Sequence, residues 1–173
     1  MTATRILTIG HSNHALAVFI ALIEGAGVSA VADARSRPVS RWVPHFNRAP
    51  LEAALAERGI SYLFLGRELG GRPDDPSLLR NGKPDYAAMA RTPAFAAGLA
   101  RVIDASAKGK VALLCAERDP IDCHRFRLIG RELAARQIDV AHILSTGEIE
   151  SHADTERRVR NNAPDDLFGR QDS

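Results

Sequence analysis

Short apolar segments of strand length alternate along the chain with stretches in which apolar residues recur at helical spacing. The strand-like segments cover residues 5–9, 28–32, 60–65, 111–115 and 138–144. Leu16, Phe19 and Ile23 show the helical spacing between the first two segments. Such alternation is typical of an α/β domain with a largely parallel sheet. The pattern therefore predicts a single Rossmann-like three-layer domain with about five mainly parallel strands and helices on both faces.

Polar residues and prolines indicate where the later helices begin. Asn47 lies one turn before Leu51, and Thr92 is followed by Pro93, a pair typical of a helix start. Asp122 is expected to cap the helix that precedes the last strand. In the first turn of the chain, one of Ser12 and Asn13 is expected to cap the first helix.

Two regions lack a regular apolar pattern. Residues 66–84 are rich in Gly, Pro and Asp, which predicts a long loop beside the sheet. From Ser145 onward the sequence becomes polar. We therefore expect one α/β domain over residues 1–150 and a polar C-terminal tail over residues 151–173.

The composition is that of an ordinary globular chain, with 173 residues, 45% of them hydrophobic, and a formal net charge of +2. No apolar segment is long enough to span a bilayer, and residues 1–10 lack the pattern of a secretory signal. We therefore expect a cytoplasmic protein without a membrane partner. The charge is distributed unevenly, because Arg35, Arg37, Arg41 and Arg48 occur in a stretch without acidic residues. Such a stretch favours an anionic ligand.

Polar side chains follow four of the predicted strands at the point where each strand ends. In a parallel sheet these ends lie at one edge, where ligands of α/β proteins bind. We expect the site there. It would combine loop residues 10–13, 33–36, 67–71 and 115–119, the last leading into residues 122–125.

The residue types in these loops suggest separate tasks. Imidazole and carboxyl groups transfer protons, and a thiol at a helix N-terminus is a candidate nucleophile. The candidate catalytic residues are His11, Asp33, Glu117 and Cys123. Guanidinium, hydroxyl and imidazole groups bind phosphate oxygens. The candidate ligand-binding residues are Ser12, Arg35, Ser36, Arg118, His124 and Arg125.

Structural alternatives exist for several of these residues. Asp33 and Arg35 could form a buried ion pair that only shapes the loop. Cys123 could be an inert buried thiol. The spacing of Cys115, Cys123 and His124 is not that of a structural zinc site, so no metal ligands are assigned, although a metal or thiol site that includes His11 stays open. Neither a G-x-G-x-x-G nor a P-loop pattern follows a strand, and the cofactor is left unknown.

Several of these motifs occur together in a known family. Gly10-His11-Ser12, Asp33-Ala34-Arg35-Ser36, Leu69-Gly70-Gly71, Cys115-Ala116-Glu117 and Cys123-His124-Arg125 follow one another in the chain. In this order they resemble the family catalogued as domain of unknown function 488, over roughly residues 5–144. The resemblance implies no activity, since the family has none assigned.

The sequence is thus compatible with three functions. We expect an enzyme of unknown reaction class that binds a phosphate-bearing ligand, either a nucleotide or a nucleic-acid end. The first alternative is a non-catalytic nucleic-acid binding module that stacks bases on Trp42, with Phe46 more suited to the core. The second is a thiol or metal site built from Cys115, Cys123, His11 and His124. The oligomeric state is not predicted.

Overall fold

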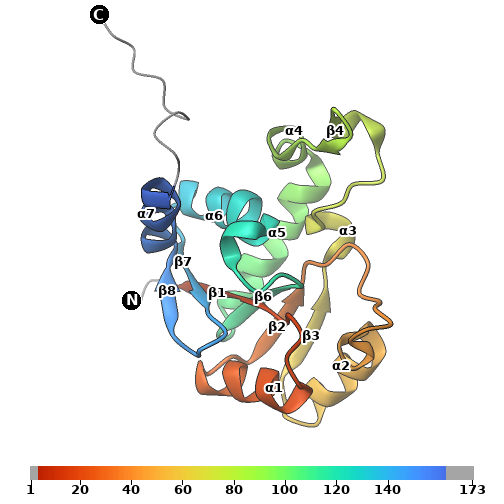
Figure 1. Cartoon of the computed structure of the whole chain (residues 1–173), viewed down its shortest axis with the longest axis vertical. Coiled ribbons are helices and arrows are strands. Elements are labelled where there is room, and N and C mark those ends of the chain that lie inside the picture. Colours follow the sequence, from red (N-terminus) through yellow and green to blue (C-terminus); the bar gives the residue numbers. More distant parts are fainter. Residues whose placement is uncertain (1–3, 163–173) are drawn as a thin grey trace, which may run out of the picture.

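A computed structural model describes residues 4–162 and shows a mostly parallel sheet covered by helices on both faces (Figure 1). The strand order is β3-β2-β6-β1-β7-β8, with β8 antiparallel to β7 and the other neighbours parallel. These strands are β1 (Arg5–Gly10), β2 (Ala30–Asp33), β3 (Ser61–Phe64), β6 (Val111–Cys115), β7 (Asp139–Ile143) and β8 (Ile149–Ser151). The predicted α/β fold with about five parallel strands is confirmed.

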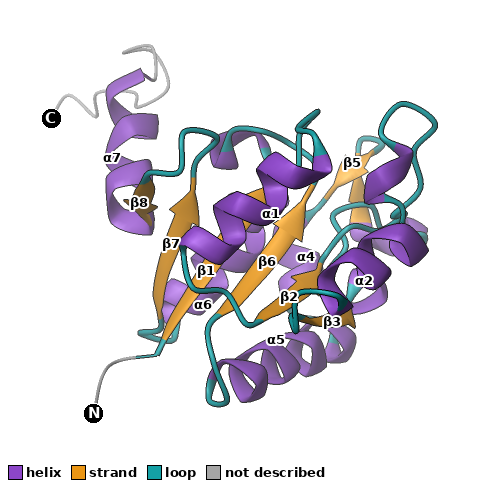
Figure 2. Ribbon diagram, turned by 90° about the horizontal axis from the view of Figure 1, so that it is seen from below, coloured by secondary structure: helices purple, strands orange, loops and turns teal. Residues whose placement is uncertain are grey.

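The helices are α1 (Leu16–Gly25), α2 (Arg48–Ala56), α3 (Gly66–Leu69), α4 (Tyr86–Ala90), α5 (Pro93–Ser106), α6 (Arg131–Ala135) and α7 (His152–Asn162). A π-helical segment, Arg125–Gly130, leads directly into α6. Side chains alternate between the two faces of each strand, so β6 contributes Leu114 to one core and Leu113 to the other. The first core lies under α1 and α2 and the second under α5 and α6 (Figure 2).

The expected helix caps are only partly correct. Thr92 accepts a hydrogen bond from the Phe95 amide and caps α5 as predicted. Asn47 precedes α2, but its side-chain oxygen accepts from the Ser40 amide instead. Neither Ser12 nor Asn13 caps α1, whose N-cap position is Ala15.

The predicted loop over residues 66–84 contains short regular elements. Besides α3, it holds a small antiparallel hairpin formed by β4 (Leu79–Arg80) and β5 (Lys83–Pro84). The Asn81-Gly82 turn of this hairpin has positive φ at both residues, which matches a type I′ turn. The hairpin and α4 stand beside the main sheet in Figure 1.

The predicted polar tail differs from the structure over its described part. Residues 149–151 extend the sheet as β8, and residues 152–162 form α7 beside it (Figure 1). The polar sequence did not predict α7 because this helix is held largely by charged contacts. Arg158 of α7 bonds to Asp119 and Glu150. Residues 163–173 lie outside the described residues. No helix in the described part of the chain is long and apolar enough to cross a membrane.

Candidate functional site

A cavity of about 590 Å³ lies at the carboxyl ends of the parallel strands. Residues that follow β1, β2 and β6 line it together with the segment after α3. The polar and charged lining residues are His11, Arg35, Ser36, Arg37, Ser40, Arg72, Tyr86, Glu117, Asp122, Cys123 and His124. Distant parts of the chain therefore meet at the edge of the sheet at which the sequence placed the site.

Strand order explains why a cavity forms at this position. β6 lies between β1 and β2 in the sheet. The chain leaves β1 and β2 toward the face covered by α1 and α2, whereas it leaves β6 toward the face covered by α6. Connections that depart in opposite directions leave a crevice between neighbouring strand ends.

His11 follows β1 and is the best-placed imidazole for proton transfer. Its Nδ1 lies 2.7 Å from the Ser12 carbonyl oxygen, which only accepts, so Nδ1 carries the proton and Nε2 keeps its lone pair. The ring stacks on Phe46 with 4.6 Å between centroids. Burial lowers the pKa of His11 to about 4, despite the opposing Ser12 hydrogen bond, so the ring is neutral at physiological pH. Ser12 itself adopts a left-handed backbone, with φ of 47°, and lies outside the cavity lining.

Asp33 is fully buried at the end of β2 and is occupied by structural partners. Its carboxylate accepts from Arg35 Nε at 2.8 Å and Nη2 at 2.6 Å, and from the Tyr62 hydroxyl at 2.6 Å. Arg35 also donates from Nη1 to the Phe46 carbonyl at 2.8 Å. Burial, followed by the bond to Asp33, raises the pKa of Tyr62. Asp33 therefore orients Arg35 and does not line the cavity, while Arg35 does.

Glycines let the segment after β3 approach the other loops. A Cβ on Gly66 would lie 2.1 Å from the Arg35 carbonyl oxygen, and one on Gly71 would lie 2.7 Å from the His124 ring. Ser36 strengthens this approach, because its hydroxyl accepts from the Arg72 amide at 3.0 Å. The result is that Arg72 joins the cavity wall. The sequence analysis did not identify Arg72 as a site residue. The two glycines directly before it were the signal that could have indicated its place in the site.

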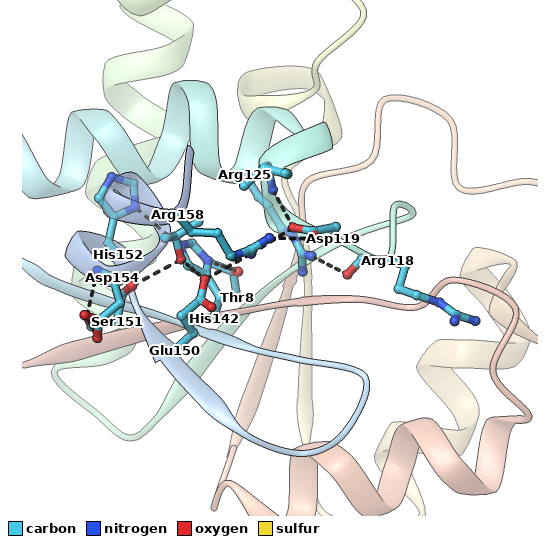
Figure 3. A network of polar contacts seen from close by, with 12 residues as sticks. Thr8, Arg118, Asp119, Arg125, His142, Glu150, Ser151, His152, Asp154 and Arg158 are labelled. Carbon is cyan, nitrogen blue, oxygen red and sulfur yellow. Dashed lines mark hydrogen bonds and ion pairs between the residues drawn. The ribbon is translucent and has the colours of Figure 1, made fainter. Parts of the chain in front are cut away.

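Two predicted anion-binding residues lie elsewhere. Arg118 is exposed and donates to the Ser12 hydroxyl and to Asn13 Oδ1, so it ties two loops together outside the cavity lining. Arg125 is completely buried, and its Nη2 donates to the Arg118 carbonyl at 3.0 Å. Figure 3 shows Arg125 inside the protein and Arg118 directed away from it. Neither residue lines the cavity: Arg118 joins its loop to the loop after β1, and Arg125 Nη2 bonds to backbone carbonyls of the loop after β6.

A polar network next to Arg125 was not predicted (Figure 3). Thr8 Oγ1 lies 2.7 Å from His142 Nδ1, and His142 Nε2 lies 3.3 Å from His152 Nδ1. His152 Nε2 lies 3.5 Å from the Glu156 carboxylate, which can only accept a hydrogen bond. Each group in the network therefore donates to the next, from Thr8 through His142 and His152 to Glu156. Burial and then the charge of Arg125 lower the pKa of His142 to about 3.

Cys115, Cys123 and His124 form a compact cluster, of which Cys123 and His124 line the cavity. One ligand atom from each lies within 4.8 Å of the others, and both thiols are buried. The contact with Cys115, followed by burial, raises the pKa of Cys123 strongly. A raised pKa disfavours the thiolate that the candidate nucleophile Cys123 would need. Glu117 is exposed at the cavity rim.

Comparison with known proteins identifies the family of this chain. The family model described as Domain of unknown function DUF488 matches residues 15–131, which include β2, β6 and the Cys-His-Arg segment but not His11. The comparisons with curated proteins and with solved structures found no match. Since the family model covers more than half of the 173 residues, the chain belongs to the family described as Domain of unknown function DUF488.

Proposed function

We propose that the cavity binds a phosphate-bearing ligand, a nucleotide or a nucleic-acid end, and that the protein is a cytoplasmic enzyme acting on it. The observation that carries this proposal is the set of three guanidinium groups, from Arg35, Arg37 and Arg72, that line one cavity together with a neutral imidazole. Planar guanidinium groups bind phosphate oxygens in bidentate fashion. Arg35 is held in place for this task by Asp33.

His11 is the proposed proton carrier. Its Nε2 bears the lone pair, since Nδ1 donates to the Ser12 carbonyl. A pKa of about 4 makes the ring a weak base in the free protein. A phosphate anion in the cavity would raise this pKa, because a nearby negative charge favours the protonated ring. Glu117 at the rim is the second group able to transfer a proton.

Ligand binding can be tested by thermal denaturation with inorganic phosphate, a nucleoside monophosphate, and single-stranded oligonucleotides with and without a 5′-phosphate. We expect the phosphate-bearing compounds to raise the melting temperature of the wild type. The double variant Arg37→Gln, Arg72→Gln should bind them at least about tenfold more weakly. Arg58→Gln is the matched control, because Arg58 is exposed and pairs with Glu24 away from the cavity. Unchanged melting temperatures with all four compounds would refute the proposal.

Catalysis is tested separately with His11→Gln. We expect this variant to retain phosphate binding and to lose turnover of whichever phosphorylated compound the wild type converts. Equal turnover in the variant and the wild type would remove His11 from the mechanism and leave only a binding role.

A second candidate function is nucleic-acid binding without catalysis. Trp42 favours it, because this residue is 80% exposed and the Arg41 guanidinium lies 4.9 Å from its ring centroid. Val39, which is 77% exposed, belongs to the same segment and lines the cavity, whereas Trp42 does not. Phe46, by contrast, is buried in the core. An exposed aromatic ring beside arginines can stack on unpaired bases while the arginines contact phosphates.

Salt titration distinguishes this candidate. Affinity for single-stranded DNA should fall as salt rises, and Arg41→Gln should reduce the slope of log K against log salt by about 1. Trp42→Ala should weaken binding by about 1–3 kcal/mol. Affinity that is independent of salt and of Trp42 would dismiss this function.

A further inference from the structure

The Cys115, Cys123 and His124 cluster has the geometry of a metal site. Cys115 is the last residue of β6, and the turn that follows brings Cys123 and His124 back over the end of this strand. His124 Nδ1 lies 3.8 Å from Cys115 Sγ and 3.7 Å from Cys123 Sγ. A tetrahedral zinc ion with ordinary Zn–S and Zn–N bond lengths separates sulfur from nitrogen by about 3.6 Å. The two sulfur-to-nitrogen separations are within a few tenths of an ångström of that value, and all three ligand atoms lie within 4.8 Å of one another.

Hydrogen bonds outside the cluster hold His124 and contact Cys123. His124 Nε2 lies 3.1 Å from the Ala34 carbonyl oxygen and donates to it, which leaves the Nδ1 lone pair free to bind a cation. Metal-binding histidines commonly donate their second nitrogen to a carbonyl in this way. The Arg125 amide donates to Cys123 Sγ at 3.5 Å, a contact that stabilises a thiolate.

The alternative of a catalytic thiolate fits these surroundings less well. Both thiols are buried, whereas reactive thiolates occur in partly exposed, electropositive surroundings. A bound divalent cation suits buried thiols, because it deprotonates the thiols that coordinate it.

We propose that Cys115 Sγ, Cys123 Sγ and His124 Nδ1 bind a zinc-type divalent cation with one coordination position open to the cavity. Cys123 and His124 line the cavity, so the fourth position is accessible to water or to a ligand oxygen. Two thiolates and one imidazole are soft and borderline ligands that suit Zn²⁺ rather than Mg²⁺ or Ca²⁺. Binding releases two protons from the thiols to solvent. This proposal does not depend on the phosphate-binding function.

The site can be tested with Co²⁺ and Zn²⁺ on the full-length protein, reduced and stripped with a chelator that is then removed. Co²⁺ should bind one to one and produce sulfur-to-cobalt charge-transfer absorption together with intense visible bands of tetrahedral cobalt. Zn²⁺ should displace it and raise the melting temperature. Cys123→Ser and His124→Gln should each weaken Zn²⁺ binding by at least about tenfold. The control His45→Gln changes a half-buried histidine outside the cluster and should bind normally.

Since replacement of a buried cysteine can prevent folding, the wild-type spectrum is the decisive measurement. Cobalt absorption without a charge-transfer band, or thiols that react equally fast with a maleimide in the presence and absence of Zn²⁺, would overturn the proposal. So would normal zinc affinity in a folded His124→Gln variant. When the phosphate experiments are carried out on protein stripped of metal in the same way, either proposal can fail without the other.

Discussion

At the residue scale, the ion pair of Asp33 and Arg35 shows how a charged motif can be both structural and close to function. Asp33 is fully buried and Arg35 is 8% exposed. Nearly all the hydrogen-bonding capacity of the Asp33 carboxylate is directed to Arg35 and Tyr62. The cavity receives only the remaining guanidinium N–H groups of Arg35. Their direction depends on Asp33, which acts through Arg35 and not on a ligand.

Replacing Asp33 therefore tests how much the buried ion pair at the end of β2 contributes to the stability of the fold. Asp33→Asn should lower the free energy of unfolding by about 3–5 kcal/mol, because it leaves the Arg35 charge buried without a counter-charge. Asp139→Asn is the control, since Asp139 pairs with Arg5 at a similar distance of 2.6 Å but both side chains are substantially exposed. That variant should lose no more than about 1 kcal/mol. Urea denaturation measures both, and equal losses would show that burial of the pair is unimportant.

Sequence reasoning located some site residues and misplaced others for identifiable reasons. His11, Arg35, Ser36, Glu117, Cys123 and His124 reach the cavity because they directly follow strands or the turn behind β6. Arg118 and Arg125 lie in the same loop, yet their side chains contact its backbone or neighbouring loops. The direction of a long side chain depends on tertiary contacts, which the spacing of residues does not contain.

At the element scale, the shape of the cavity depends on how closely α3 approaches the end of β2. Gly66 is the first residue of α3, and a Cβ there would meet the Arg35 carbonyl oxygen at 2.1 Å and the Phe64 ring at 2.7 Å. The backbone oxygen cannot move without displacing Arg35 and its bonds. A side chain at this position would therefore separate two of the loops that form the cavity.

The variant Gly66→Ala should consequently be destabilised by about 1–3 kcal/mol, the usual cost of overpacking. Gly25→Ala is the matched control, because Gly25 ends α1 without a positive φ and a methyl group added there would have no atom within 4 Å. It should be neutral or stabilising by up to about 1 kcal/mol, since alanine favours the helix. Thermal or urea denaturation compares the two. A Gly66→Ala variant as stable as Gly25→Ala would show that α3 moves away freely.

Elements with an apolar pattern were predictable from the sequence, whereas those held by charge were not. The five parallel strands each contain a run of apolar residues, and all five are present. β8 and α7 lack such a run, and α7 buries only His152 and Thr155. Arg158 holds α7 to Asp119 at 2.9 and 3.0 Å. An ion pair across 39 positions leaves no periodic signal in the chain.

At the scale of the whole molecule, the parallel sheet brings charged side chains together in one cavity, which the small net charge of the chain does not indicate. The formal net charge is only +2, yet three arginines line a single cavity that also contains Glu117 and Asp122. The same sheet buries several ionisable groups, among them His142 on β7 and His11 after β1. Burying a histidine in its neutral form links the stability of the entire fold to pH.

This linkage predicts a loss of stability in mild acid. The pKa of His142 is lowered to about 3 and that of His11 to about 4, whereas both are near 6.5 in the unfolded chain. The unfolded state therefore binds more protons than the folded state below pH 6.5. The stability that these histidines contribute is complete above that pH and falls toward pH 4. Each group lowers the free energy of unfolding by up to about 1.4 kcal/mol per pH unit in this interval.

His142→Gln isolates one of these contributions. Its free energy of unfolding, measured with urea between pH 6 and 4.5, should depend on pH less steeply than that of the wild type, by about 1.4 kcal/mol per pH unit. Between pH 7.5 and 8.5 the two slopes should coincide, because histidines are then neutral in both states. A constant offset between the two proteins is compatible with lost packing around His152. If the free energies of unfolding of the two proteins ran parallel throughout the acid range, His142 would be protonated in the folded protein. The charge of Arg125 would then not keep a proton off this histidine.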